Sequence, residues 1–173
     1  MRLRSILPVT VTVTVSALAL AVAATHAAAT TAPCPTHPAS TVSPNRWPPA
    51  HLKLLPPGAT TLRLCRFDGY AGTSPPKLAS SSEITSTKLI AQLTHDLNAL
   101  PAYPKLALPC PMDNGAQVDV LATYRDGEHV TVDYESTGCN RVTNGDVVRI
   151  ANGYRDEALA ARLRRELGAP GYG

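Results

Sequence analysis

The fold is decided by residues Gln117–Tyr134, which read QVDVLATYRDGEHVTVDY. Apolar and polar residues alternate on both sides of Arg125-Asp126-Gly127, a pattern typical of two strands that bury one face. A three-residue loop with its glycine in the left-handed region pairs Val120 with Val132. A two-residue Asp-Gly turn instead sets Val120 against Asp133 and mixes the two faces. The sequence therefore predicts an antiparallel hairpin with the longer loop.

The predicted register places two acidic side chains opposite each other on the outer face. Asp119 faces Asp133, and Glu135 follows two residues further along. Facing carboxylates destabilise a sheet unless a bound Ca²⁺, a shared proton, a neighbouring Arg149 or Lys, or solvent compensates. Exposed charges are the rule, so we expect a solvated acidic surface cluster, with a cation site or an acid/base pair as alternatives. An EF-hand calcium loop is not indicated, because its spacing is absent around Asp113-Asn114-Gly115.

Outside this hairpin, apolar residues recur at two-residue and at 3–4-residue spacing. The stretch 77–85 is ambiguous, because its serines and the capping-box spacing of Ser80 and Glu83 are also compatible with a helix start. We expect an α+β fold, an antiparallel sheet of about five or six strands packed on one side by two helices. The predicted elements are strands at Thr60–Phe67 and Lys77–Thr85, a helix from there to about Ala99, a second hairpin of Asn140–Thr143 with Asp146–Ile150, and a helix at Asp156–Leu167.

The N-terminus has the pattern of a signal peptide. Arg2 and Arg4 precede an apolar stretch, and Ala27 and Ala29 form an A-x-A cleavage pattern. A transmembrane anchor is the alternative, but threonines and a serine interrupt the apolar run. Proline directly before Cys34 does not fit a lipobox. We therefore predict a protein secreted after cleavage, with no stable membrane anchor.

Four cysteines in an exported chain predict two disulfides. Three connectivities are possible, and we prefer Cys34–Cys65 with Cys110–Cys139. The first pair pins the Pro-rich arm onto a strand, and the second closes the open end of the main hairpin. No closely spaced Cys/His pattern supports zinc, and oxidised cysteines cannot serve as a catalytic thiol.

Charge and motifs exclude several classes of function. The 173 residues carry 16 Lys and Arg against 13 Asp and Glu, and Arg2 and Arg4 lie in the predicted signal peptide. No basic stripe remains that indicates nucleic-acid binding. The chain contains no G-x-S-x-G, H-E-x-x-H, Walker or G-x-G-x-x-G motif, so we predict no catalytic, cofactor-binding or metal-binding residue. The expected organisation is a signal peptide at 1–29, a Pro-rich arm at 30–58, an α+β domain at 59–168 and a flexible tail at 169–173.

Several short motifs resemble those of small exported proteins of high-GC Gram-positive bacteria. That group has a signal peptide or lipobox, a Pro-rich arm and the same strand–helix–hairpin order. The resemblance implies a fold and no catalytic residue, since the group has no assigned activity. This chain lacks the anchor signal of the lipobox-bearing members. The motifs are Leu64-Cys65-Arg66, Leu97-Asn98 with Pro101, Cys110-Pro111-x-Asp113-x-Gly115, Tyr124-x-x-Gly127 and Gly138-Cys139.

A looser resemblance is to the exported subtilisin inhibitors of the same bacteria. Those proteins are of similar size, have two disulfides and pack an antiparallel sheet against helices. They present their reactive bond in a loop held by closely spaced cysteines. Here Pro109-Cys110-Pro111-Met112 is the one comparable stretch, and Pro111 is expected to hinder insertion into a protease cleft.

By elimination, the sequence favours an extracellular binding protein whose partner is another protein or a cell-envelope component. A free sheet face around Leu121 is one candidate docking surface. A protease inhibitor, with an exposed loop within Ala102–Gly115, is the alternative. A hydrolase with an unrecognised site is the least favoured function.

Overall fold

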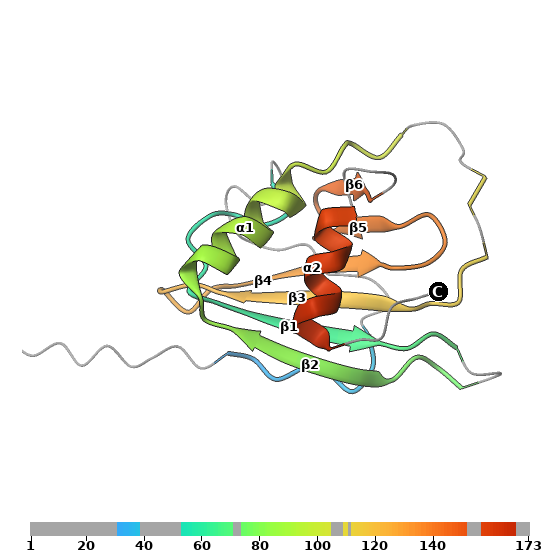
Figure 1. The fold of residues 1–173 in the computed structure, drawn as a ribbon, viewed down its shortest axis with the longest axis horizontal. Coiled ribbons are helices and arrows are strands. Elements are labelled where there is room, and N and C mark those ends of the chain that lie inside the picture. The colour runs from blue at the N-terminus through green and yellow to red at the C-terminus, as the bar shows by residue number, and fades with distance from the viewer. Residues whose placement is uncertain are drawn as a thin grey trace, which may run out of the picture.

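The computed structural model describes residues 31–38, 53–70, 74–104, 109–110, 112–151 and 157–168. These residues form a six-stranded antiparallel sheet and two helices (Figure 1). The strand order across the sheet is β2-β1-β3-β4-β5-β6. The predicted α+β architecture is therefore confirmed. The elements are β1 Thr61–Phe67, β2 Leu78–Ile84, α1 Thr87–Asn98, β3 Gln117–Thr123, β4 His129–Glu135, β5 Arg141–Thr143, β6 Val148–Ile150 and α2 Glu157–Leu167.

The predicted register of the main hairpin is confirmed. Val120 lies opposite Val132, and Asp119 lies opposite Asp133. Gly127 has a φ of +85°, the left-handed value that the three-residue loop requires. The ambiguous stretch 77–85 is mostly strand β2, and α1 begins only after Ser86, whose side chain accepts a hydrogen bond from the Leu89 backbone N–H.

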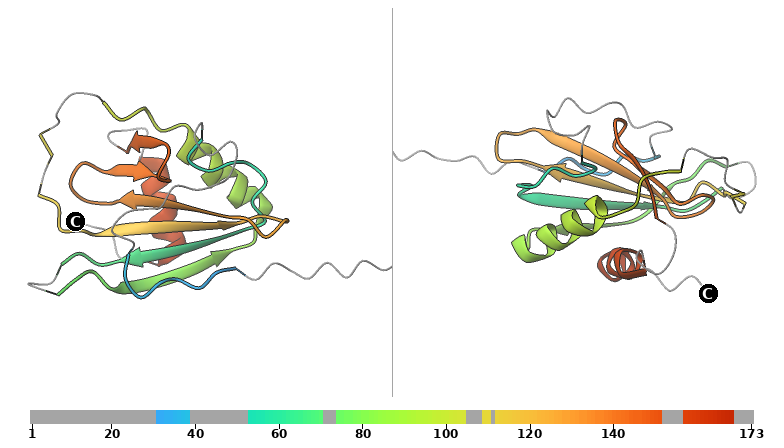
Figure 2. Two further views of the ribbon diagram at one scale, coloured as in Figure 1. Left: turned by 180° about the vertical axis from the view of Figure 1, so that it is seen from behind. Right: turned by 90° about the horizontal axis from the view of Figure 1, so that it is seen from above.

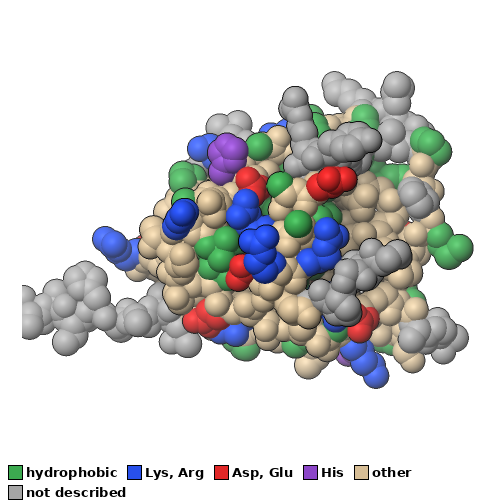
Figure 3. Space-filling model, in the orientation of Figure 1, with side chains coloured by type: hydrophobic (Ala, Val, Ile, Leu, Met, Phe, Trp, Pro, Cys, Tyr) green, Lys and Arg blue, Asp and Glu red, His purple; other side chains and the backbone are tan. Residues whose placement is uncertain are grey.

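Both helices cover one face of the sheet, as Figure 2 shows from above. Alternate residues of the central strands, such as Leu64 and Val120, are fully buried beneath them. The helices are joined by Arg162 of α2, whose Nε donates to Asp96 Oδ2 at 3.1 Å and whose Nη1 donates to Gln92 Oε1 at 3.2 Å. On the surface above them, basic and acidic side chains are intermixed (Figure 3).

The apolar pair Leu54-Leu55 extends the core beyond the two layers. Both residues have no exposed surface, although they lie at the end of the predicted Pro-rich arm. Asn98 of α1 exchanges two hydrogen bonds with the Leu55 backbone, and the Asn144 amide donates to the carbonyl of Leu54. The Tyr124 hydroxyl donates to the Pro56 carbonyl at 2.6 Å. This segment therefore belongs to the folded domain.

The segment Thr31–Pro38 lies on the sheet face opposite to the helices (Figure 2). A disulfide joins Cys34 to Cys65 of β1, and the backbone N–H of Leu78 donates to the Thr36 carbonyl. His37 Nδ1 lies 2.9 Å from the Pro76 carbonyl. The predicted signal peptide and tail lie outside the described residues. Within the described part of the chain, no helix is long and apolar enough to span a membrane.

Candidate functional site

The most exposed large apolar side chain among the described residues is that of Met112, at 91%. Met112 lies in the long connection between α1 and β3, which precedes the main hairpin. Two residues before it, Cys110 forms a disulfide with Cys139, as predicted. Pro111 lies outside the described residues. An apolar side chain is thus presented to solvent directly after a covalent anchor.

The residues that follow Met112 are held by side-chain hydrogen bonds. Asp113 Oδ1 accepts from the backbone N–H of Gly115 at 2.8 Å, and Asn114 Oδ1 accepts from that of Ala116 at 3.0 Å. Thr137, from the segment after β4, places its hydroxyl 2.9 Å from both of these oxygens. The segment is therefore anchored after Met112 as well as before it.

Close backbone approaches support the same segment. The N–H of Tyr70 donates to the Asn114 carbonyl at 2.6 Å. A Cβ at Gly69 would lie 2.5 Å from Asn114 Cγ, and one at Gly138 would lie 2.9 Å from Asp113 Cβ. Larger residues at either glycine would push the segment out of place. The connection between β1 and β2 and the segment around Gly138 therefore flank Asp113 and Asn114 on two sides.

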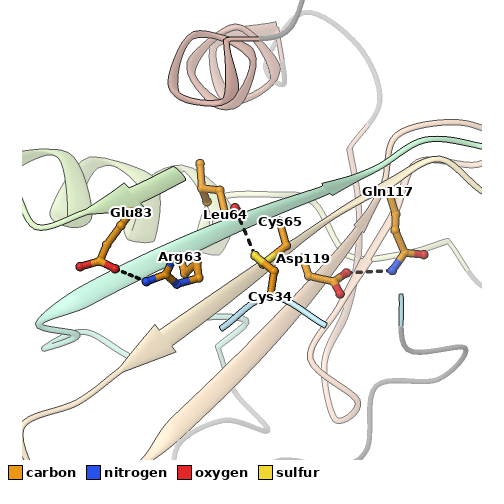
Figure 4. Close-up of a disulfide and its surroundings, with 7 residues drawn as sticks. All are labelled: Cys34, Arg63, Leu64, Cys65, Glu83, Gln117 and Asp119. Carbon is orange, nitrogen blue, oxygen red and sulfur yellow. Dashed lines mark hydrogen bonds and ion pairs between the residues drawn. A yellow bond between two sulfur atoms is a disulfide. The ribbon is translucent and has the colours of Figure 1, made fainter. Parts of the chain in front are cut away.

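The predicted acidic cluster is not solvated, so that prediction is wrong for two of its three members. Asp119 is 3% exposed and Asp133 is 5% exposed, because both lie on the sheet face that the segment 31–38 covers. Figure 4 shows Asp119 beside the Cys34–Cys65 disulfide, where its carboxylate accepts a hydrogen bond from Gln117 Nε2 at 2.8 Å. Glu135 is half-buried.

Burial changes the protonation of this pair. Loss of solvation raises the pKa of Asp119 from 3.8 to about 6, opposed by the hydrogen bond from Gln117. The pKa of Asp133 rises to about 7, first through burial and then through repulsion from Asp119 and Glu135, opposed by Arg141. At neutral pH the pair therefore holds a proton for part of the time.

The other predicted features take simple structural places. Arg141 pairs with Glu135 through its Nε at 2.9 Å. Leu121, on the face proposed as a docking surface, is half-buried. Among the described residues, no three His, Cys, Asp or Glu side chains are grouped so that they could hold a metal ion.

Sequence reasoning singled out the acidic pair, and it named Met112 only as part of the stretch Pro109-Cys110-Pro111-Met112, without giving its side chain a role. The available signal was the order of residues in Cys110-Pro111-Met112 followed by Asp113-Asn114-Gly115, in which a disulfide and an Asx-rich turn bracket one apolar residue. Only the structure shows that this residue is exposed to solvent while Cys110, Asp113 and Asn114 are anchored. Comparison of the chain with protein-family models, curated proteins and solved structures found no match.

Proposed function

We propose that this protein is a secreted inhibitor of subtilisin-type serine proteases, and that it presents the segment Cys110–Gly115 to the enzyme as a substrate mimic. The observation that carries the proposal is the 91% exposure of Met112 on a segment anchored at both ends. A protease inhibitor is one kind of extracellular binding protein, the broader class that the sequence favours. The predicted signal peptide at 1–29 supports it, because such enzymes act outside the cell.

The anchoring explains how a substrate-like segment can inhibit. Met112 enters the apolar primary pocket of the enzyme, and the catalytic serine attacks the Met112 carbonyl carbon. Cleavage yields an acyl-enzyme on Met112 and a free amine on Asp113. The Cys110–Cys139 disulfide and the Thr137 hydrogen bonds hold the two ends together. The amine therefore stays in place and re-forms the peptide bond, expelling the serine, faster than water can hydrolyse the ester.

Contrary to the expectation from the sequence, this mode of binding tolerates a proline at position 111. In an extended segment that pairs with another strand, alternate residues direct their N–H groups to the same side. When Cys110 and Met112 pair with the edge of the enzyme cleft, the backbone nitrogen of residue 111 faces away. Proline there loses no hydrogen bond, and it favours an extended conformation at Cys110. A pre-ordered segment also loses less entropy on binding.

Replacing the exposed methionine tests the proposal directly. Met112→Ala should raise the inhibition constant against a subtilisin by about 30- to 150-fold, because about 2–3 kcal/mol of apolar burial in the enzyme pocket is lost. Met112→Leu should stay within about threefold, since it conserves volume. The inhibition constant is measured with a chromogenic peptide substrate. Val148, 40% exposed and distant in sequence, provides the control Val148→Ala. An unchanged constant for Met112→Ala contradicts the proposal.

A second contact with the enzyme is expected at Tyr70. Its side chain is 59% exposed, and its ring packs so close to Gly115 that a Cβ there would lie 2.6 Å from a ring carbon. Tyrosines beside a central anchor often contribute to binding. Tyr70→Ala should weaken inhibition about tenfold, and Tyr70→Phe should retain it. Leu78→Ala removes a less exposed apolar side chain, at 37%, and should have no effect. Equal losses for Tyr70→Ala and Leu78→Ala would count against this contact.

A further inference from the structure

A pocket of about 340 Å³ lies on the sheet face opposite to the helices and borders the candidate site at Tyr70 and Gly115. Its walls are largely apolar and come from the N-terminal segment and the connection between β1 and β2: Pro38, Tyr70, Pro75 and Pro76. Its polar lining includes Asp133 and Glu135 of β4 and Arg141 of β5. This size is near the lower end of the range for small-molecule sites.

One buried carboxylate oxygen at the polar side of this pocket has no hydrogen-bond partner in the described part of the chain. Asp133 is only 5% exposed, and the unpartnered atom is its Oδ1. Two donors that line the pocket are engaged elsewhere, since the Gln117 amide donates to Asp119 and the Arg141 guanidinium donates to Glu135. A buried carboxylate oxygen without a donor is costly, so a ligand that supplies one is favoured.

We propose that this pocket binds a primary ammonium group on an unbranched alkyl chain, with Asp133 as its counter-ion. Two carboxyl groups line the pocket, Asp133 and Glu135, against the one guanidinium of Arg141. The proline walls and the Tyr70 ring match the alkyl chain, and the ring face also attracts a cation. A bare metal ion fits less well, because the described residues include no group of three that could ligate it. The site does not depend on the inhibitor proposal.

Binding should depend on pH through the ionisation of Asp133. The charged and titratable groups around it are His37 from the N-terminal segment, Asp119 from β3, Glu135 from β4 itself and Arg141 from β5, with Tyr70 on the wall. Its pKa of about 7 means that the carboxylate is mostly ionised at about pH 8.5 and mostly neutral at about pH 5.5. An alkylammonium stays charged throughout this range. We expect binding about tenfold or more weaker at the lower pH.

The test is an NMR titration of the mature chain with n-butylammonium chloride. Sodium chloride at the same ionic strength and n-butanol serve as controls for salt and for the alkyl chain. We expect saturable shifts at His37, Tyr70 and Gln117, with a dissociation constant of about 1–10 mM, and none with either control. Asp133→Asn should weaken binding about tenfold or more, and Glu135→Gln should weaken it less. Glu83→Gln removes a carboxylate of the exposed Arg63 pair and should change nothing.

A second probe identifies the source of the ammonium group. Binding of N-acetyl-lysine amide as well as n-butylammonium supports the proposal with a lysine side chain as ligand. Binding of n-butylammonium alone supports it with a free amine. The proposal is overturned if neither probe gives saturable shifts at either pH, or if Asp133→Asn binds as well as the unaltered protein. No protease enters this assay, so its failure leaves the inhibitor proposal untouched.

Discussion

The double variant Cys110→Ala/Cys139→Ala should inhibit a subtilisin at least about 100-fold less well than the unaltered protein. Without this disulfide the segment before Met112 loses its covalent anchor. The part of the chain that is bound to the enzyme through Met112 can then separate from the Asp113 amine. Water then completes the hydrolysis, and the inhibitor becomes a substrate. The measurement is residual protease activity over time, with the fragments identified by mass. A cut after Met112 should accumulate only in the variant.

The other disulfide provides the matched control. Cys34–Cys65 spans 31 residues and Cys110–Cys139 spans 29, so the entropic stabilisation from each is nearly the same. Each double variant should lose about 3–4 kcal/mol of unfolding free energy. Cys34→Ala/Cys65→Ala should nevertheless retain inhibition at temperatures where it stays folded. Equal loss of inhibition in the two variants would mean that the Cys110–Cys139 disulfide stabilises the fold and has no separate role in inhibition.

Stability should increase on acidification from about pH 8 to about pH 5, by about 3–4 kcal/mol in unfolding free energy. Burial raises the pKa of Asp119 to about 6 and that of Asp133 to about 7, from 3.8 for both. The folded state therefore binds protons more tightly than the unfolded chain. The gain begins as pH falls through about 7 and is complete near 3.8, where the unfolded carboxyls also take up protons. Urea unfolding at each pH measures it.

Asp133→Asn isolates the contribution of the pair. The variant keeps the shape of the side chain and removes its charge, so at about pH 8 it should be about 2–3 kcal/mol more stable than the unaltered protein. Most of the pH dependence should disappear with it. Glu83→Gln, at an exposed ion pair, should change stability by less than about 1 kcal/mol. A stability that falls between pH 8 and pH 5, or a destabilised Asp133→Asn, would contradict the buried-pair account.

The main hairpin was predictable because one physical constraint decided its register. With one face buried, a slip of one residue turns every side chain to the wrong side. The alternation of Val118, Val120 and Val132 therefore selected the three-residue loop that the structure contains. The preferred disulfides followed from the same placement of elements, and both are present.

The burial of Asp119 and Asp133 could not be predicted in the same way. The alternation of apolar and polar residues assigns both aspartates to the outer face, but it does not predict which segment covers that face. The cover is the segment 31–38, whose Cys34 meets Cys65 from a distant part of the chain. The burial of Leu54 and Leu55 was missed for a related reason. The surrounding prolines indicate an arm, and only contacts with distant parts of the chain show that the pair belongs to the core.

The exposure of Met112 also lay beyond sequence patterns. A single methionine between a cysteine and an Asp-Asn turn can pack inward or point outward. Thr137, Tyr70 and Gly138 hold the neighbouring Asp113 and Asn114 in place, and they come from two separate connections that no local pattern brings together.

The central claim is tested most directly by titrating a fixed amount of active subtilisin with the purified protein, prepared without residues 1–29. The account predicts that activity falls in a straight line to zero at about one molar equivalent. The bound protein should remain intact. Full protease activity at excess protein, with the chain digested at many sites, would contradict it.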